Sequence, residues 1–443
     1  MAISPFDSGI FAPLLGDERI AALFDDGARI RSMLRAEAAL ARAQARIGLV
    51  PDGPARRIDA TAARLEVDPA TLGAATARDG IPVTALVQAL REALDDEAAG
   101  YVHWGATSQD ILDTALVLAL RDVADLVDER CRAVSDALVR LARSHRDTLA
   151  VARTRTQQAV PTSFGLKVAG WAEPLIAERR CLVSLRPRLL RAQLGGAGGN
   201  LSVFGPRGPE VLEAFAAELD LGAPALPWHA QRESLVAFGD LLARITGALG
   251  KLGQDVTLMC QNEVGELRIG TGGGSSAMPH KSNPVAAETL VALARAGATA
   301  VPGLHHAQLH AHERDGAAWM QEWIFLPQLC DATAAALAHA ERLVDGLEVD
   351  TARMHENATG GLGLVLAEAA TCALAAYMPP TDARRIVTDA CHRARTERRH
   401  LLEILEALNA APVDWGAVAA PDAILAGARV LFDRFMDRVG PEQ

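Results

Sequence analysis

The sequence predicts an all-α fold that contains several long helices. Only 4% of its 443 residues are aromatic although 50% are hydrophobic, and a core of alanine, leucine and valine favours closely packed helices. Residues 106–160 contain neither glycine nor proline, in a chain with 37 glycines and 22 prolines. Apolar residues recur there at steps of three and four, which is the spacing of one helix face: Leu116, Ala119, Val123, Leu126, Val134, Leu138 and Leu141.

The chain divides into three parts in this prediction. Residues 1–105 form an N-terminal domain of shorter helices, which the breaks at Pro51, Gly80 and Pro82 separate. Residues 106–350 form a central domain, a bundle of long helices. Residues 351–443 form a C-terminal domain of short helices, and no stretch alternates long enough to build a sheet.

The first long helix is expected to begin beside Thr107 and to run towards Leu149. The sequence TSQD at 107–110 fits a capping box, with Thr107 as the N-cap and Asp110 three residues later. Further long helical stretches are expected at 231–266, 285–301 and 317–345.

Charge and cysteine content exclude several classes of protein. The 44 basic and 55 acidic residues give a net charge of −11, which argues against nucleic-acid binding.

The N-terminus lacks a basic region followed by an apolar stretch, and no run of about twenty uncharged apolar residues occurs, so we expect neither a signal peptide nor a membrane span. The six cysteines are scattered without a CxxC pair, which is typical of reduced thiols. We therefore expect a cytoplasmic protein.

The glycine-rich segment GTGGGSSAMPHKSNP, residues 270–284, is interpreted as a catalytic lid. Its glycines prevent a stable helix, while Ser275 and Ser276 supply hydroxyls, Lys281 a cation and Asn283 an amide. A serine can abstract a proton only when its alkoxide is stabilised, and a nearby lysine with backbone N–H groups provides that. An ordinary flexible loop remains an alternative. A phosphate-binding loop is disfavoured because the GxxxxGK[ST] pattern is absent.

The segment HWGATSQD, residues 103–110, predicts an anion site. Thr107 and Ser108 place two hydroxyls where free N–H groups and the positive end of a helix dipole coincide, which suits a carboxylate. A plain helix cap is the alternative. His103 is either a proton carrier or a packed histidine.

The segment at 152–167 gathers Arg153, Arg155, Gln157 and Lys167 near the end of the first long helix. Such a cluster suits substrates with more than one carboxylate, and a solvated helix end is the alternative.

The histidine-rich segment HHAQLHAHERD, residues 305–315, has the spacing of a possible metal site at His306, His310 and Glu313. It lacks the HExxH pattern and follows directly on Pro302 and Gly303, so we expect no metal there.

Three of these segments resemble the signature regions of the fumarase/aspartase superfamily. GSSAMPHKSNP (274–284) matches the GSSxMPxKxNP signature at every fixed position. HWGATSQD resembles the first region, and RTRTQQAVPTSFGLK (153–167) resembles the second, which usually reads RTHxQxAxPxTFGxK. QLGGAGGNL (193–201) is similar to the family's Gly-rich turn, and the resemblance covers nearly the whole chain.

The resemblance implies a homotetramer in which central helices of four subunits form one bundle. It also implies active sites assembled from three subunits, a small di- or tricarboxylate substrate, and neither cofactor nor metal. The catalytic residues that it implies are Ser275 as the base, Lys281 and Glu288, with Arg155 in the place of a histidine. The substrate-binding positions are His103, Thr107, Ser108, Arg153, Thr154, Gln157, Ser276, Met278 and Asn283.

The arginine at position 155 is a departure from the family pattern. Most members carry a histidine there that, with a glutamate, protonates a leaving amine or hydroxyl. A guanidinium cannot donate that proton at neutral pH, but it stabilises a leaving carboxylate, whose pKa is about 4. This favours the carboxymuconate cycloisomerase branch, to which VHWGATSQDILDT and HERDGAAWMQEW are also similar. That branch forms a lactone from 3-carboxy-cis,cis-muconate in protocatechuate degradation, through an aci-carboxylate.

Three alternatives stay open. The first is adenylosuccinate lyase or another fumarate-releasing lyase of the same superfamily. The second is a cycloisomerase for a sulfonated or otherwise substituted muconate. The third is a catalytically silent helical scaffold, which the intact lid signature disfavours.

Overall fold

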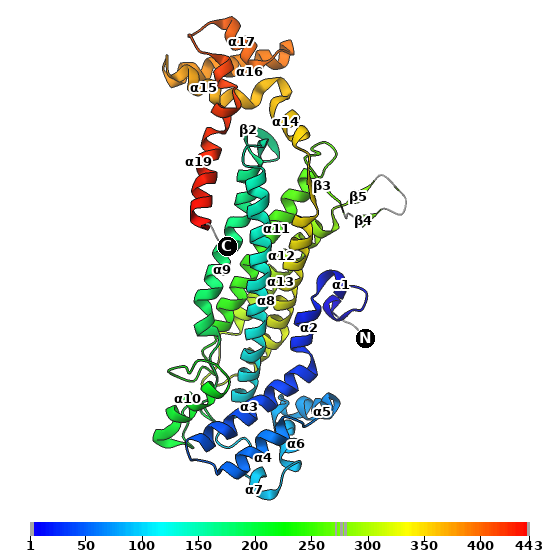
Figure 1. The fold of residues 1–443 in the computed structure, drawn as a ribbon, viewed down its shortest axis with the longest axis vertical. Coiled ribbons are helices and arrows are strands. Elements are labelled where there is room, and N and C mark those ends of the chain that lie inside the picture. The colour runs from blue at the N-terminus through cyan, green and yellow to red at the C-terminus, as the bar shows by residue number, and fades with distance from the viewer. Residues whose placement is uncertain (1–3, 271–272, 275–277, 279–280, 441–443) are drawn as a thin grey trace. The chain divides into compact units, whose positions relative to one another are not determined.

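The computed structural model describes residues 4–270, 273–274, 278 and 281–440. These residues form helices almost throughout, which confirms the all-α prediction (Figure 1). The chain forms two compact units. The first contains Met1–Cys131, Ala177–Gly247 and Ala292–Ala338, and the second contains Arg132–Ile176, Ala248–Val291 and His339–Gln443. The division into parts at residues 105 and 350 stays a prediction.

The first unit contains the N-terminal helices, and the expected breaks fall at their ends. One helix begins directly after Pro51, another ends at Gly80 in a left-handed conformation (φ 77°), and a third follows Pro82. The helices of this part are α1 (Ala12–Leu15), α2 (Glu18–Phe24), α3 (Asp26–Arg46), α4 (Asp52–Ala62), α5 (Pro69–Asp79), α6 (Val83–Glu92), α7 (Asp96–Ala99) and α10 (Gly208–Glu218), with short 3₁₀ turns at Pro5–Asp7 and Gly205–Arg207.

Five long helices each contribute a segment to both units. They are α8 (Ser108–Ser144), α9 (Phe164–Leu189), α11 (Glu233–Met259), α12 (Val285–His306) and α13 (Gly316–Asp345). Helix α8 begins where the capping box predicts, but it ends five residues before Leu149. Helix α9 was not expected, because Pro174 and Pro187 interrupt its sequence pattern.

The second unit contains the C-terminal helices and three short strand pairs. The strands are β1 (Leu149–Thr154) with β2 (Gln157–Ser163), β3 (Leu267–Ile269) with β6 (Leu347–Val349), and β4 (Gly273–Gly274) with β5 (Ser282–Asn283). The helices are α14 (Thr351–Thr359), α15 (Ala367–Ala375), α16 (Pro380–Glu397), α17 (Leu401–Leu408), α18 (Trp415–Val418) and α19 (Pro421–Val439), with a 3₁₀ turn at Gly361–Leu366.

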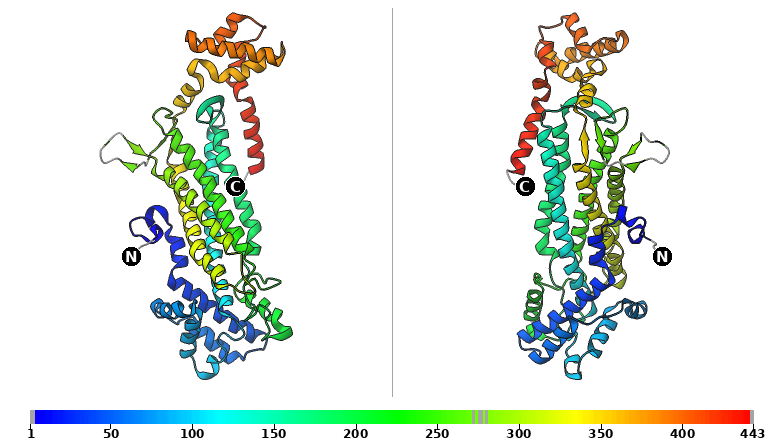
Figure 2. Two further views of the ribbon diagram at one scale, coloured as in Figure 1. Left: turned by 180° about the vertical axis from the view of Figure 1, so that it is seen from behind. Right: turned by 45° about the vertical axis from the view of Figure 1, so that its right-hand side comes forward.

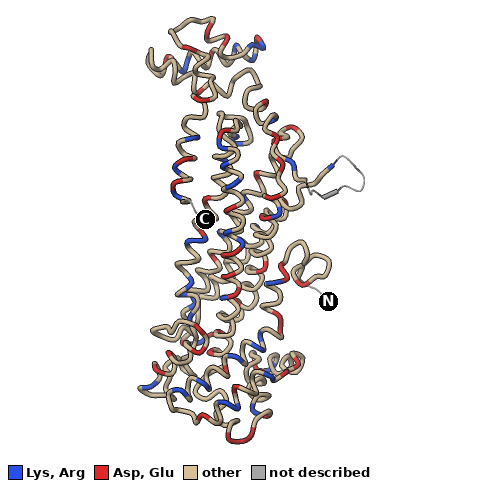
Figure 3. Tube along the Cα trace, viewed as in Figure 1, with Lys and Arg blue, Asp and Glu red and all other residues tan. Residues whose placement is uncertain are grey.

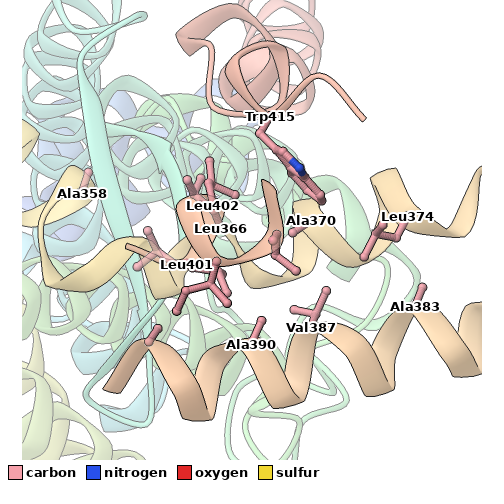
Figure 4. Close-up of a cluster of buried hydrophobic side chains, with 14 of the residues drawn as sticks. Ala358, Leu366, Ala370, Leu374, Ala383, Val387, Ala390, Leu401, Leu402 and Trp415 are labelled. Carbon is pink, nitrogen blue, oxygen red and sulfur yellow. The ribbon is translucent and has the colours of Figure 1, made fainter. Parts of the chain in front are cut away.

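Small apolar side chains join the C-terminal helices of the second unit. Ala370 and Leu374 of α15 face Val387 of α16, while Leu401 and Trp415 close the cluster (Figure 4). All five are at most 8% exposed. The views in Figure 2 show these helices, in orange, gathered into one group. A core with few large aromatic side chains is well filled only if its helices pack closely, and the small alanine side chain permits this.

The segment Trp415–Val439 is long and apolar enough to span a membrane by length and composition alone, and 17% of its most apolar 18-residue window is buried. Two of its charged residues form ion pairs within the second unit. Asp433 lies 2.7 Å from Arg146, and Arg429 lies 2.6 Å from Asp147. Acidic and basic residues are interspersed along the described chain (Figure 3). Ion pairs of this kind favour contact with water over contact with lipid.

A buried acidic residue in the first unit joins the N-terminal segment to α13. Asp331 is 8% exposed, and its Oδ1 accepts a hydrogen bond from the Asp17 backbone N–H at 2.5 Å. The Asp17 carboxylate is paired with Arg130 at 2.5 Å. Burial raises the pKa of Asp331 to about 6, and the negative charges of Asp17 and Asp7 act in the same direction.

We expect the Asp331→Asn variant to be more stable than the wild type at pH 7.5 and to lose a pH dependence. The pKa of Asp331 is higher in the folded state than the unfolded value of about 3.9. The protonated side chain therefore contributes its full stability below pH 4, and the folded protein loses that stability as the pH rises through 6 and Asp331 ionises. The difference should be about 1–2 kcal/mol, discounted for partial access of water. Urea unfolding at pH 4.5 and 7.5 measures it, and an equal pH dependence of both proteins would contradict the assignment.

Candidate active site

The start of α8 forms one half of the predicted capping box, since the Asp110 backbone N–H bonds to the Thr107 carbonyl and not to its hydroxyl. The Thr107 backbone N–H donates to Asp110 Oδ2 at 2.9 Å, so the acidic side chain reaches back to the N-cap. The Thr107 hydroxyl oxygen accepts a hydrogen bond from Arg314 Nη1 at 2.9 Å. This leaves the hydroxyl proton free to donate to an anion, beside a guanidinium that adds positive charge.

The buried Asp110 carboxylate also fixes the Gly-rich turn at 193–201. It accepts backbone N–H groups from Gly195 at 2.8 Å and Gly196 at 3.0 Å, and His229 Nε2 lies 2.6 Å from its Oδ1. A Cβ on Gly195 would lie 2.7 Å from the His229 ring, so only glycine fits there. One carboxylate therefore holds the helix start, the turn and the histidine together.

His103 and Ser108 line one cavity of about 610 Å³ in the first unit. Its walls come mainly from α5 and α6 and are partly apolar, with polar side chains from Arg78, Asp79, Thr84, Gln88, Arg91 and Glu92. His103 Nδ1 lies 2.6 Å from Glu37 Oε1. A small anion in this cavity would meet the Ser108 hydroxyl and the free edge of the imidazole.

The RTRTQ segment forms a hairpin turn, not the end of a helix as the sequence pattern predicted. Arg155 and Thr156 alone connect β1 to β2, and both have left-handed backbones, with φ of 50° and 68°. Two-residue hairpin turns need such angles and usually contain asparagine and glycine. For arginine and a β-branched threonine the conformation costs about 1–2 kcal/mol each, and strain of this kind is concentrated at functional sites.

The turn is held by a buried carboxylate below it. Arg153 Nη1 and Nη2 donate to the two oxygens of Glu266 at 2.9 and 2.6 Å, and Asn357 Nδ2 donates to Oε1 at 2.9 Å. The strand register shifts between Val151 and Arg153, which turns Arg153 towards Glu266. The Glu266 side chain is 0% exposed. This pairing favours a positioning role for Arg153 over direct contact with substrate.

The lid segment is described only in part. Ser275 and Ser276 lie outside the described residues. Strands β4 and β5 pair Gly273 with Asn283 and bring the two ends of the segment together. Met278 and Lys281 are exposed, Asn283 is half-buried, and the exposed Glu288 lies in the first turn of α12.

The predicted residues fall into separate groups. His103, Thr107 and Ser108 belong to the first unit, whereas the hairpin residues Arg153, Thr154, Arg155 and Gln157 belong to the second, as do Lys281, Asn283 and Glu288. Within the described residues, no hydrogen bond or ion pair joins Arg155 to Glu288, and the Arg155 side chain is exposed. An ion pair between these two residues is therefore not formed within this chain.

No group of three histidine, cysteine or acidic residues in the described ranges has the geometry of a metal site. His305, next to the suspected histidines, pairs instead with Asp240 at 2.9 Å.

The comparisons with known proteins agree with the motifs. The lyase family model matches residues 18–303. A 3-carboxy-cis,cis-muconate cycloisomerase of Bradyrhizobium diazoefficiens is 39% identical over 98% of this chain and 98% of its own length. A nitrosuccinate lyase of Streptomyces davaonensis is 38% identical over 90% of this chain and 87% of its own length. The crystal structure of the 3-carboxy-cis,cis-muconate lactonizing enzyme from Pseudomonas putida is 38% identical, with a TM-score of 0.89 over 97% of this chain and 98% of that one.

The chain belongs to this lyase family. The membership confirms the resemblance to the fumarase/aspartase superfamily.

Three residues that support the site in this lyase were missed at the sequence level. Glu37 is the one acidic residue in the helical stretch MLRAEAALARAQ, and an isolated acid among alanines is a usable signal of a buried partner. Arg314 lies in the HERDG motif, which was considered for its possible metal ligands and for its resemblance to the cycloisomerase branch, but not for this arginine. Glu266 gave no signal, because its link to Arg153 joins residues 113 positions apart.

We expect Glu266→Gln to destabilise the second unit and to release the strained turn. The substitution leaves the guanidinium of Arg153 without its charged partner, at a cost of about 2–3 kcal/mol. Thermal unfolding and proteolysis near residue 155 measure the two effects. The matched control is Glu356→Gln, which removes an exposed ion pair with Arg353 and should change stability by less than about 0.5 kcal/mol. Equal effects of both substitutions would contradict the role given to Glu266.

Proposed function

We propose that the chain is a cofactor-independent cycloisomerase that converts 3-carboxy-cis,cis-muconate into 4-carboxymuconolactone. The observation that carries the proposal is Arg155, a permanent cation at the tip of a strained turn, with no partner among the described residues. The cycloisomerase named above is similar over nearly its whole length, which supports the same reaction.

The cation suits lactone chemistry because both ends of the reaction are oxyanions. In ring closure, one substrate carboxylate is the nucleophile, and in ring opening the same group leaves as a stable anion. Neither direction needs a proton donor at that oxygen. Arg155 can stabilise the carboxylate throughout, whereas an amine or hydroxide leaving group would need a titratable acid.

The proposed reaction has two steps, an internal addition and a protonation. A carboxylate oxygen forms a C–O bond to the distal carbon of a conjugated double bond, and the electron pair moves into the neighbouring carboxylate to give the aci-carboxylate. Ser275 then delivers a proton to the carbon α to that group and is reprotonated from water. The reverse direction uses the Ser275 alkoxide as the base.

Donors around the aci-carboxylate stabilise the charge that develops in the transition state. Thr107 and Ser108 contribute hydroxyls at the start of α8, and Arg314 adds a charge beside Thr107. Lys281 and Asn283 contribute a cation and an amide from the lid, and Glu288 assists from α12. Fixed donors of this type are worth about 2.7–4 kcal/mol each in comparable oxyanion sites.

The family resemblance supports a homotetramer with shared active sites, and so does an unpaired cation in the second signature region. Within the described residues no hydrogen bond or ion pair joins Arg155 to Glu288, and both side chains are exposed. A site that takes one region from each of three subunits would satisfy these residues with partners from other copies.

The shared site predicts complementation between two inactive variants. Thr107→Val and Ser275→Ala each remove one region, so their mixed tetramers should regain roughly a quarter of wild-type activity, because each region has an even chance of coming from an unmutated copy. Activity is measured after the two proteins are unfolded together and refolded. Each variant refolded alone is the control, and a mixture as inactive as the controls would count against sites shared between subunits.

A fumarate-releasing lyase is the second candidate. Its support is the nitrosuccinate lyase, which is nearly as similar to this chain as the cycloisomerase is. Adenylosuccinate is a further substrate of this class to test, and 3-sulfomuconate tests the substituted-muconate alternative. Release of fumarate without lactone formation would replace the present proposal.

We expect Arg155→Gln to lower kcat/KM for 3-carboxy-cis,cis-muconate about 100-fold, and Ser275→Ala to abolish turnover. Loss of a charged hydrogen bond in the transition state costs about 1.5–3 kcal/mol, and Arg155→Lys should recover part of the activity because it retains the charge. The decrease of diene absorbance in the ultraviolet follows the reaction. An unaffected rate in the Arg155→Gln enzyme would remove the basis of the assignment.

A further inference from the structure

The inference concerns a buried glutamate in helix α3 of the first unit. Glu37 is 2% exposed and lies among Ala36, Ala38 and Ala39, which are also buried. One carboxylate oxygen lies 2.6 Å from His103 Nδ1, and the other has no hydrogen-bond partner in the described chain. A carboxylate in such surroundings is costly unless it is paired with a positive charge.

The same helix holds the histidine's own loop in place. His103 has a left-handed backbone with φ of 61°, which is uncommon for a residue with a side chain. Gln44, two turns further along α3 and fully buried, donates its Nε2 to the Trp104 carbonyl at 2.7 Å. Two polar side chains from one helix therefore fix this turn. Only one of them, Glu37, carries charge.

We infer that Glu37 keeps His103 as an imidazolium whose free edge binds a second carboxylate of the substrate, in the cavity that His103 shares with Ser108. This inference rests on the function proposed above and adds a positioning residue that the motifs do not contain. The ligand class is a small polycarboxylate, whose second carboxylate contacts the imidazolium while the Ser108 hydroxyl serves the aci-carboxylate.

The charges around His103 agree with this role. Burial by itself lowers the pKa of His103, but the hydrogen bond and the charge of Glu37 outweigh burial, so the pKa is raised overall. Asp110 of α8 acts in the same direction as Glu37, and Arg91 of α6 opposes them. The same cavity is also lined by Arg78 and Asp79 of α5 and by Glu92 of α6. The cation should therefore persist to higher pH than in an ordinary histidine.

The role is binding, not proton transfer. Because the carboxylate that His103 contacts is charged both in the substrate and in the transition state, the interaction contributes equally to both. Its loss should raise KM and leave kcat nearly unchanged. A proton donor would show the opposite pattern.

The first test is titration of His103 by NMR in the intact protein. The resonance is assigned by its loss in His103→Gln. We expect its midpoint in the wild type to lie above that of a free histidine, and to fall in Glu37→Gln, where burial and Arg91 act without the opposing carboxylate. A midpoint that does not change on Glu37→Gln overturns the inference. This readout needs no substrate, so it is independent of the proposed function.

The second test is the kinetics of Glu37→Gln with 3-carboxy-cis,cis-muconate. We expect KM at pH 7.5 to rise about tenfold with kcat within about twofold, because a charged hydrogen bond is lost from both states. In Glu37→Gln, KM should begin to increase at a lower pH than it does in the wild type. A fall of kcat at constant KM overturns the binding role.

The matched control is Gln44→Leu, which removes the neutral anchor of the same loop. It should loosen the loop and leave the His103 midpoint unchanged. If it shifts the midpoint as Glu37→Gln does, Glu37 acts through structure alone and the inference fails. If the wild type forms no lactone while the titration behaves as expected, the proposed function fails and the pairing of Glu37 with His103 stands.

Discussion

Three buried carboxylates hold the signature motifs in place, and the site depends on this constraint. Glu37 pairs with His103, and Asp110 links the start of α8 to the Gly-rich turn by hydrogen bonds. Glu266 forms an ion pair with Arg153 of β1. Each is at most 2% exposed. Because a buried carboxylate must find donors, it admits only one arrangement of the backbone N–H, imidazole or guanidinium around it. The arrangement that satisfies the acids is also the one that presents the motif residues.

Strain at the two motif turns has the same origin. His103, Arg155 and Thr156 all have left-handed backbones, although none is a glycine. Such conformations persist only where the surroundings determine them more strongly than the local preference does. At the first turn the surroundings are the side chains of α3, and at the second they are the ion pair and the Asn357 amide beneath the hairpin. The left-handed backbones therefore occur at the two turns that carry His103 and Arg155.

The sequence predicted what depends on local patterns. The helix starts after Pro51 and Pro82, the left-handed Gly80 and the capping box at Thr107 each follow from a few neighbouring residues. The hairpin was missed because its turn, Arg-Thr, lacks the glycine and asparagine that identify such turns. The partners of His103 and Arg153 were missed because they lie 66 and 113 residues away, and spacing within a motif carries no information about contacts at that range.

The overall charge makes the local arrangement of cations decisive. A tricarboxylate approaching a chain of net charge −11 meets repulsion at long range, but physiological salt screens this beyond about 8 Å. Within that distance the substrate encounters fixed groups. Arg155 and Arg314 stay charged at every relevant pH, and Glu37 extends the range over which His103 does so. An acidic protein can thus bind a polyanion, provided that a few cations such as Arg155 and Arg314 lie within this screening distance of the bound ligand.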